Sequence, residues 1–436
     1  MTAPSAPGGD WVRLHPLTPL LRGGRTALLL IALVGQQGFR SSPEAVLALL
    51  GVLVPVAVFF GWLSWRAMRY RVTATELQVD SGVLVKRSRR VPLARVQAVD
   101  VVKPFYARVL GLAELRLEVV GGGGGDAEAP LAFLNEDRAD ALRVQLLDLS
   151  AGRPAAVEGG PAPVEPPETV LVIVPTRVLV WSTLLGAPAV TVLVLLAAVL
   201  VGSQVSGAAL SAVVLAGGPA LFGVGSMAVR QLLSHYGFTV AESPDGLRLR
   251  HGLLDTRSQT IPAGRVQAVR IREPLLWRRA GWVRVDVDVA GYSGSGEQQL
   301  ATSALLPVAP RELALQLVAR VLGSTLPPAD RPVPRAARWR APLSARRLSL
   351  GLDAQHVVST SGILTTTTDI APLAKVQSLR RTSGPWQRRL GLASVHVDTA
   401  GRRLPGAVLL HRGEADATAL LADLTQRAGA ARSGAR

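Results

Sequence analysis

The sequence contains no cysteine among its 436 residues. This absence excludes disulfide bonds, zinc–thiolate sites, iron–sulfur clusters and cysteine nucleophiles. Aromatic residues make up only 4% of the chain, too few for the stacking platforms of single-stranded nucleic-acid binders. Charged residues account for only 18%, whereas apolar residues account for 48%. This composition excludes a disordered chain and indicates insertion into a membrane.

Lysine is also scarce, because only three of the 48 basic residues are lysine and the formal charge of +17 comes almost entirely from arginine. The arginine bias, with abundant alanine, glycine, valine and leucine, fits a GC-rich bacterial genome as well as selection for arginine chemistry.

Three long runs without charged residues reach the length of about 20 residues that crosses a bilayer. They cover 45–65, 178–201 and 207–229. A shorter run, 26–39, leads into the first of them through a short link. We interpret it as a short or tilted helix and as an uncleaved anchor rather than a signal peptide. The sequence therefore predicts two transmembrane hairpins.

Arginine residues flank both predicted hairpins on the same side. They are Arg13, Arg22, Arg25, Arg66, Arg69, Arg71, Arg177 and Arg230. The positive-inside rule then places both termini and all large polar regions in the cytoplasm. No ionisable residue lies within the four apolar runs, which argues against a pump or transporter. The predicted location is the bacterial cytoplasmic (inner) membrane, as a multi-pass protein.

One motif occurs three times in the chain. It reads Pro-x-x-Arg/Lys-Val-Gln, with one glycine ten residues before the proline and another fourteen residues after the glutamine. Its residues are Gly82, Pro92, Arg95, Gln97 and Gly111; Gly252, Pro262, Arg265, Gln267 and Gly281; and Gly362, Pro372, Lys375, Gln377 and Gly391. Because the register between the two glycines holds without a gap in every copy, the chain contains three copies of one domain.

Each copy has the same local pattern. After the second glycine, apolar residues alternate with polar ones, as at Leu115, Leu117 and Val119, which predicts a half-buried strand. An apolar stripe with helical spacing then ends each copy, at 136–149, 310–322 and 414–428. Each copy is therefore predicted to be several antiparallel strands followed by one covering helix.

These features predict nine segments along the chain. They are an N-terminal cytoplasmic segment (1–25), a transmembrane hairpin (26–65), a first domain (66–150), a Pro/Gly-rich linker (151–177), a second transmembrane hairpin (178–229), a second domain (230–323), a Pro-rich linker (324–342), a third domain (343–428) and a basic tail (429–436).

The repeated motif, together with the paired apolar runs, resembles the bacterial PH-like domain of YdbS/YdbT-type membrane proteins. The order of hairpin, domain, hairpin and two further domains is similar to the YdbT-type arrangement. The resemblance implies a multi-domain membrane protein with two transmembrane α-helical hairpins and three α+β PH-like split-barrel domains, each with a C-terminal helix. It also implies a YdbS-type membrane partner, and association with further copies of the chain stays open.

Basic residues between the motif glutamine and the second glycine are candidate contacts to a lipid headgroup or a partner. They are Lys103, Arg108, Arg270, Arg272, Arg278, Arg279, Arg380, Arg381, Arg388 and Arg389. Aromatic or apolar residues such as Phe105 and Trp386 lie among them, as in loops that enter the headgroup region. A solvated loop with one core aromatic residue is the alternative. The segment 331–436 carries a net charge of +11, so its copy is the one best suited to an anionic surface.

The motif itself also has two interpretations. Its bases Arg95, Arg265 and Lys375 could hold an anionic headgroup. A structural role, in which the proline starts a strand and the glutamine satisfies a turn, is the interpretation we favour, because all three copies keep the motif while their other charges differ.

The sequence offers little for catalysis. The six histidines are scattered without metal-ligand spacing, and we interpret Asp286 and Asp288 as the solvated face of a strand. We expect no enzyme, no metal, no cofactor and no specific nucleic-acid binding. The expected function is a non-enzymatic integral membrane protein whose cytoplasmic PH-like domains bind inner-leaflet lipid or partner proteins, as a membrane scaffold or envelope-maintenance factor. The alternative is a lipid-indifferent protein–protein assembly module that works with a partner membrane subunit.

Overall fold

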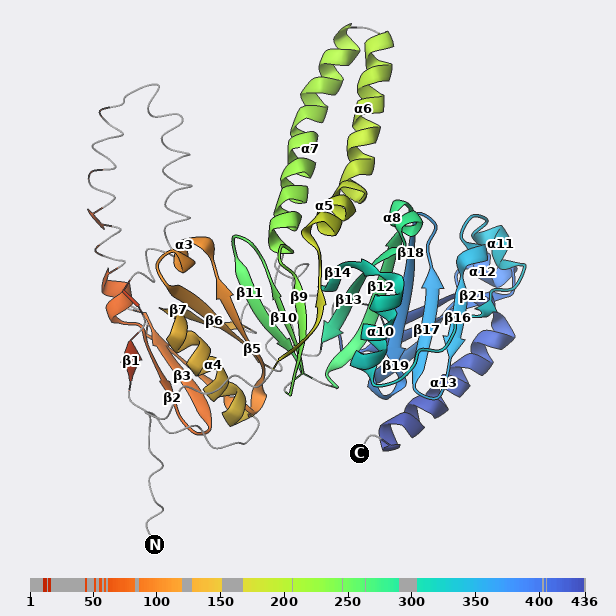
Figure 1. Cartoon of the computed structure of the whole chain (residues 1–436). Coiled ribbons are helices and arrows are strands. Elements are labelled where there is room, and N and C mark those ends of the chain that lie inside the picture. The colour runs from red at the N-terminus through yellow and green to blue at the C-terminus, as the bar shows by residue number, and fades with distance from the viewer. Residues whose placement is uncertain are drawn as a thin grey trace. The chain divides into compact units, whose positions relative to one another are not determined.

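The structure is a computed structural model of the whole chain (Figure 1). It describes residues 62–82, 86–119, 128–150, 168–205, 207–244, 246–262, 264–289, 304–401, 404 and 406–434, with scattered positions in 11–16 and 44–59. The predicted N-terminal segment and most of the first predicted hairpin lie outside these residues. The chain divides into two compact units. Unit 1 is Met1–Pro166 with Leu254–Gln259, and unit 2 is Pro167–Leu253 with Thr260–Arg436.

Unit 1 contains the first copy of the repeat, folded as two antiparallel sheets and a helix. The first sheet is β1 (Val12–Arg13), β2 (Arg69–Val72), β3 (Glu76–Ser81) and β4 (Arg87–Pro92), in that order. The second joins β5 (Val96–Lys103), β6 (Leu112–Val119) and β7 (Glu128–Asn135). The helices are η1 (Leu93–Arg95), α3 (Phe105–Arg108) and α4 (Glu136–Ser150).

The repeated motif forms the corner between these two sheets. Pro92 ends β4, the next three residues make the short helix η1, and Val96 begins β5. The expectation that the proline starts a strand was therefore wrong. Its fixed φ of −62° suits the last extended position before the turn, where no further ladder hydrogen bond is needed. Leu93 and Val96 are buried on either side of the turn and hold the corner against the core.

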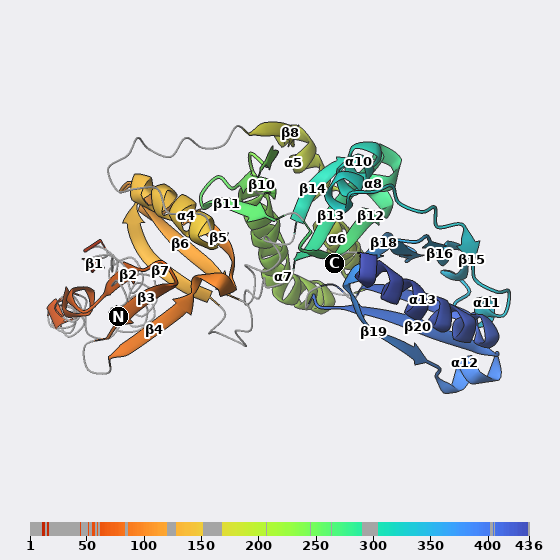
Figure 2. The same ribbon diagram turned by 90° about the horizontal axis from the view of Figure 1, so that it is seen from below.

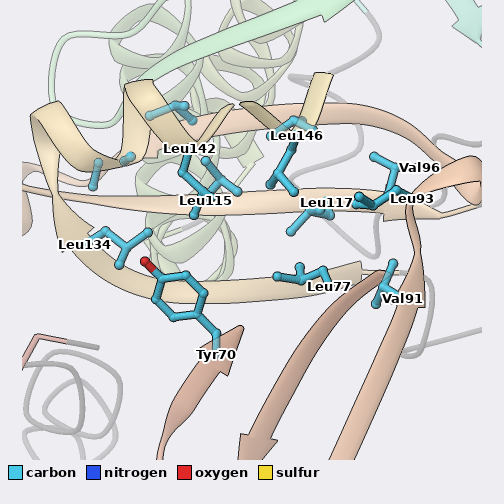
Figure 3. Close-up of a cluster of buried hydrophobic side chains, with 14 residues drawn as sticks. Tyr70, Leu77, Val91, Leu93, Val96, Leu115, Leu117, Leu134, Leu142 and Leu146 are labelled. Atoms are coloured by element: carbon cyan, nitrogen blue, oxygen red, sulfur yellow. The ribbon is translucent and has the colours of Figure 1, made fainter. Parts of the chain in front are cut away.

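The core of unit 1 lies between the two sheets and the covering helix. Figure 3 shows Leu142 and Leu146 of α4 facing Leu115 and Leu117 of β6. The alternation in β6 and the helical spacing in α4 bring these apolar faces together, and burying one leucine side chain contributes about 1.5–3 kcal/mol. Tyr70 of β2 closes the same cluster from the first sheet.

Unit 2 contains most of the second copy and the whole third copy. Its strands are β8 (Thr169–Ile173), β9 (Thr239–Ser243), β10 (Gly246–His251), β12 (Val266–Pro274), β13 (Trp282–Val289), β14 (Ala304–Pro310), β15 (Arg331–Pro332), β16 (Ser349–Leu352), β17 (His356–Ser361), β18 (Thr365–Pro372), β19 (Val376–Thr382), β20 (Leu392–Thr399) and β21 (Ala407–Gly413). Its helices are α5 (Thr176–Leu184), α6 (Ala187–Val205), α7 (Gly207–Ser234), α8 (Leu275–Ala280), α10 (Arg311–Leu322), α11 (Ala337–Arg340), η3 (Ala345–Arg347), η4 (Leu373–Lys375), α12 (Pro385–Arg389) and α13 (Glu414–Gly434).

The strands of unit 2 form three groups. β10, β9 and β8 pair in that order, a seven-stranded sheet has the order β14-β13-β12-β18-β17-β16-β15, and the third group is the sheet β19-β20-β21. Figure 2 shows α13 lying over β19 and β20, where its Leu420 and Leu424 join a buried cluster. The expectation of repeated domains that combine antiparallel strands with a C-terminal helix is confirmed.

Each of the first two copies pairs with the following copy, and each copy of the pair contributes one strand. In unit 2, β12 of the second copy pairs with β18 of the third, with Val269 opposite Ile370. In unit 1, β5 pairs with the first residues of β11 (Thr256–Ile261), with Lys103 opposite Thr256. Counted from the motif prolines, the two pairings have the same register. The same surface of the repeated domain therefore forms the interface at both junctions.

The second apolar hairpin is divided differently from the prediction. The run 178–201 is not one helix, because α5 ends at Leu184 and α6 begins at Ala187. Pro188 explains the break, since proline is tolerated in the first turn of a helix and not in its interior. Within the described residues, no helix combines the length and the apolar character needed to cross a bilayer.

Both predicted linkers and the predicted tail are shorter than expected. The segment 151–177 already contains β8, whose β-branched sequence pairs with β9, and 324–342 contains β15 and α11. The tail 429–436 continues α13 as far as Gly434. Ala428 is buried there, and Arg432 donates a hydrogen bond to the carbonyl of Val376 at 2.8 Å, so the last turns are held against the third copy.

The six motif glycines all have positive φ values, between 61° and 108°. At Gly362 a Cβ atom would lie 2.0 Å from the carbonyl oxygen of Thr365, whereas Gly391 has open space around it. The close approach of the chain in the β17–β18 turn therefore requires glycine more strictly than the α12–β20 turn does.

Gly362→Ala is expected to destabilise unit 2 by about 3 kcal/mol or more, because it adds a backbone clash to a left-handed conformation. Gly391→Ala is the matched control and should cost about 1–2 kcal/mol, since only the conformation is unfavourable there. Urea unfolding of the detergent-purified chain, followed by tryptophan fluorescence, measures both. Equal losses would contradict the role of the close approach.

Candidate functional site

A short helix with an exposed apolar tip follows the strand after the motif in every copy. The tip residues occupy equivalent positions and are Phe105 and Tyr106 in α3, Leu275 and Leu276 in α8, and Pro385 and Trp386 in α12. The side chain of Trp386 is 67% exposed. An arginine follows each tip, at Arg108, Arg278 and Arg388. Each copy thus presents an exposed apolar tip beside an arginine.

The turn after the first motif glycine adds a second exposed apolar pair. It consists of Leu253 and Leu254 in the second copy and of Ile363 and Leu364 in the third, with Leu364 71% exposed. The equivalent residues of the first copy lie outside the described residues. The sequence analysis missed this pair, although two apolar residues after each of three aligned glycines were a visible signal. Exposed apolar residues gathered at one place are typical of interaction sites.

In unit 2 the two features meet across the junction between copies. Arg278 of α8 donates to the hydroxyl of Thr366 at 2.8 Å and to the carbonyl of Ile363 at 3.4 Å. Arg347 donates to the same carbonyl at 3.0 Å. Helix α8 and the β17–β18 turn therefore form one surface, with Leu276 and Leu364 exposed on it.

This surface lies at the end of unit 2 from which α6 and α7 project (Figure 1). The indole of Trp277, on α8, donates to the carbonyl of Ser182 in α5 at 2.9 Å, and this tryptophan is only 5% exposed. The amide of Leu253 donates to the carbonyl of Leu233 in α7, also at 2.9 Å. Helix α8 and the β10–β11 turn are thus fixed to the base of the helical hairpin.

Five of the ten candidate cations lie on strands, where carboxylates pair with them. Arg270 donates to Asp369 at 2.5 Å, Arg272 to Asp286 at 2.6 Å, Arg380 to Asp398 at 2.8 Å and Arg381 to Glu414 at 3.4 Å, and Lys103 pairs with Glu136 and with Asp140. These pairs reduce the net charge that the strands present to a ligand. Their role in lipid or partner contact stays a prediction.

The other five candidate cations lie on the short helices. Arg108 donates to the hydroxyl of Thr256 at 2.9 Å, in the same way as Arg278 bonds Thr366. Arg279, Arg388 and Arg389 are exposed at the helix ends. Unit 2 therefore presents Arg279, Arg388 and Arg389 next to the apolar tips of α8 and α12.

The motif bases are not gathered into one site. Arg95, Arg265 and Lys375 lie at or just after the corner turns and are exposed or half-buried. Gln267 is buried and donates to the carbonyl of Arg265 at 3.3 Å, whereas Gln377 is exposed. A headgroup contact by the motif bases stays a prediction.

The polar face of β13 is buried, so its interpretation as a solvated face was wrong. Asp286 accepts hydrogen bonds from Arg272 and Arg284, the latter at 2.9 Å. Asp288 accepts one from the amide of Leu404, which lies in the connection after β20 and covers this face. The two guanidinium groups compensate the buried charge of Asp286, which would be costly without a partner. Within the described residues, no group of three potential ligands forms a metal site.

A buried histidine adjoins this network at the foot of α7. Burial, and after it the charge of the nearby Arg284 guanidinium, lowers the pKa of His235 to about 3. Its Nδ1 lies 2.9 Å from the carbonyl of Gln231, and its ring stacks near Phe238 and His251. The imidazole is therefore neutral in the folded protein at pH 5–7.

Acidification is expected to destabilise unit 2 through His235. Because the unfolded chain binds a proton near pH 6.5 and the folded chain only near pH 3, the free energy of unfolding falls by about 1.4 kcal/mol per pH unit below 6.5. In urea unfolding at pH 7 and pH 5, the loss of stability should be smaller by about 2 kcal/mol in His235→Phe than in the wild type, because this part of the loss comes from His235. His396→Phe, at a half-exposed histidine, is the control and should leave most of the loss in place. An unchanged pH dependence in His235→Phe would contradict this assignment.

Comparison with known proteins agrees with this architecture. The Bacterial PH domain family matches residues 26–150, 183–325 and 317–428, one match for each copy. The transmembrane protein YdbT of Bacillus subtilis (strain 168) is 22% identical over 283 residues. That alignment covers 59% of this chain and 57% of the relative, so the chain spans less than two thirds of the relative's length. The three family matches cover most of the chain and confirm the resemblance drawn from the motif: the chain belongs to the Bacterial PH domain family.

Proposed function

We propose that the chain is a non-enzymatic, membrane-embedded protein whose PH-like domains contact the lipid surface through their apolar helix tips and adjacent arginines. The observation that carries this proposal is the surface of unit 2 in which Leu276 and Leu364 lie exposed at the base of an apolar helical hairpin. As a scaffold or envelope-maintenance factor, such a protein holds its domains at the inner leaflet.

The side chains of α6 and α7 support insertion of this hairpin into the membrane. Leu215 is 80% exposed and Phe222 79% exposed, and Leu193 and Leu200 also face outward. A helix that exposes apolar residues over much of its surface is stable when lipid or protein surrounds it. The relative from Bacillus subtilis is named a transmembrane protein, which agrees with this proposal. The positive-inside rule then favours cytoplasmic domains.

The chemistry of the surface favours an anionic headgroup layer. Each arginine near an anionic leaflet contributes about 1 kcal/mol, and tryptophan settles at the interface between headgroups and acyl chains. The third copy combines Arg388 and Arg389 with the exposed Trp386. Its segment 331–436 also carries the net charge of +11, although no hairpin precedes it directly.

Assembly through protein contacts alone is the second candidate function. The strand pairings between successive copies favour it, because they show that this domain can use its sheet edge to bind another domain of its kind. The two functions differ in what the apolar tips contact, so a probe placed on those tips separates them.

The absence of native cysteine allows a direct test of lipid contact. Leu364→Cys and Trp386→Cys, each labelled with an environment-sensitive NBD dye, are reconstituted as the full chain in vesicles that contain lipids with a quenching doxyl group. We expect blue-shifted, quenched emission at both positions in anionic vesicles, weakening as salt screens the arginines. Arg388→Gln with Arg389→Gln should reduce the part of the signal that depends on anionic lipid.

Gln355→Cys is the matched control, because Gln355 is exposed in the turn at the opposite end of β17. Its label should stay unquenched in every vesicle. If the labels at positions 364 and 386 behave like this control at low salt, lipid contact by the third copy is excluded, and the assembly module becomes the function to pursue.

A further inference from the structure

The third copy has an open sheet edge. In each of the first two copies, the equivalent edge is covered by a strand of the following copy. Strand β19 is at the end of its sheet, and among the described residues it pairs with β20 alone. The equivalent strands β5 and β12 each pair with a strand of the following copy. Gln267 of β12 is 6% exposed, whereas its counterpart Gln377 in β19 is classed as exposed. An uncovered edge presents backbone donors and acceptors to any strand that can pair with it.

The two covered junctions share one set of contacts. Besides the common register, the arginine after the helix tip bonds a threonine six residues before the next motif proline: Arg108 with Thr256 and Arg278 with Thr366. In unit 2, Arg270 also meets Asp369, which lies directly opposite it and three residues before Pro372. A docking strand is therefore recognised by its backbone, by a hydroxyl and, at this junction, by a carboxylate.

We propose that β19 and α12 form a docking edge for a PH-like domain carried by a separate chain. The register places Arg380 opposite the residue three positions before the partner's motif proline, and Arg388 near the residue six positions before it. The fitting partner has an acidic residue at the first position and serine or threonine at the second. This inference concerns a partner and does not depend on lipid contact.

Charge excludes the chain's own first copy as that partner. At the two positions it has Arg89, in its edge strand β4, and Lys86, directly before that strand. Docking in the common register would put Arg89 opposite Arg380 and Lys86 near Arg388. Facing like charges destabilise a strand pair, so the chain is protected from adding copies of itself end to end.

The resting contact of Arg380 can be exchanged. Arg380 donates to Asp398 on the neighbouring strand, and both groups are partly exposed. In the second copy, the equivalent arginine Arg270 bonds Asp369 of the following copy, while Asp288, the counterpart of Asp398, accepts the amide of Leu404. The covered copy therefore shows the arrangement that β19 adopts when its edge is occupied.

Two substitutions that give the first copy the residues of the fitting partner turn the chain into its own docking partner; we call this variant the recoded chain. The probe is the full chain with Lys86→Thr and Arg89→Asp, compared with the wild-type chain in detergent by sedimentation velocity. We expect self-association at least about tenfold tighter than in the wild type, because both facing like-charge contacts are removed. Adding Arg380→Asp to the recoded chain should reverse this gain. The new carboxylate at position 380 then lies opposite the carboxylate introduced at position 89 and beside that of Asp398.

Arg380→Asp alone is a second route to the same answer, because it creates an opposite-charge pair with Arg89 in the otherwise unchanged chain. It should also self-associate, so the test survives if the recoded β4 does not fold. A thermal melt of each variant identifies a folding failure. Monomeric behaviour of both folded variants would overturn the proposal.

Cross-linking tests the register. In the recoded chain, Ser88→Cys and Arg381→Cys lie directly opposite in the proposed pairing and should form an intermolecular disulfide under mild oxidation. Arg90→Cys with Arg381→Cys is the out-of-register control and should not. Equal cross-linking of both pairs would overturn the pairing. Because the experiments use detergent without anionic lipid, their outcome is separate from that of the vesicle test.

Discussion

The need of an edge strand for a partner governs the arrangement of this chain. A β-strand at the edge of a sheet leaves a row of backbone groups without a ladder, and this protein covers such edges with the next copy of the same domain. The pairing of β12 with β18 joins seven strands from two copies into one sheet. The second and third copies therefore share a sheet, and the boundary between them in the sequence is no boundary of the fold.

The features that repeat were the ones that could be predicted. The motif glycines, the alternation before Val119 and the helical stripe with Leu142 identified the domain and its number of copies, because a hydrophobic period directly reflects which face is buried. Pairing between copies could not be predicted, since β18 contacts a strand about one hundred residues earlier and its sequence, rich in threonine, carries no mark of a partner. The burial of Asp288 was missed for a related reason, because its contact with Leu404, in the connection after β20, exists only once two copies are joined.

For the candidate site, too, the sequence predicted some features and missed others. The sequence showed that cations and aromatics lie between the motif glutamine and the second glycine, but spacing alone could not separate Trp277, which is fixed against α5, from Trp386, which is exposed. Equivalent loops have different surroundings. Helix α8 lies at the base of a helical hairpin, whereas α12 belongs to the third copy, which no helical hairpin directly precedes. A short helix with an apolar tip can thus be fixed to a hairpin in one copy and leave its tip exposed in another.

The shared sheet also has a consequence for synthesis. The ribosome completes β12 about one hundred residues before it reaches β18, and at 5–20 residues per second this interval lasts roughly 5–20 s. During this interval the second copy has its local hairpin of β12 and β13 but an open edge on the other side. The nascent chain is then exposed to wrong strand pairing on a crowded ribosome. The order of the copies therefore leaves the sheet edge of the second copy open until the third copy has been synthesised.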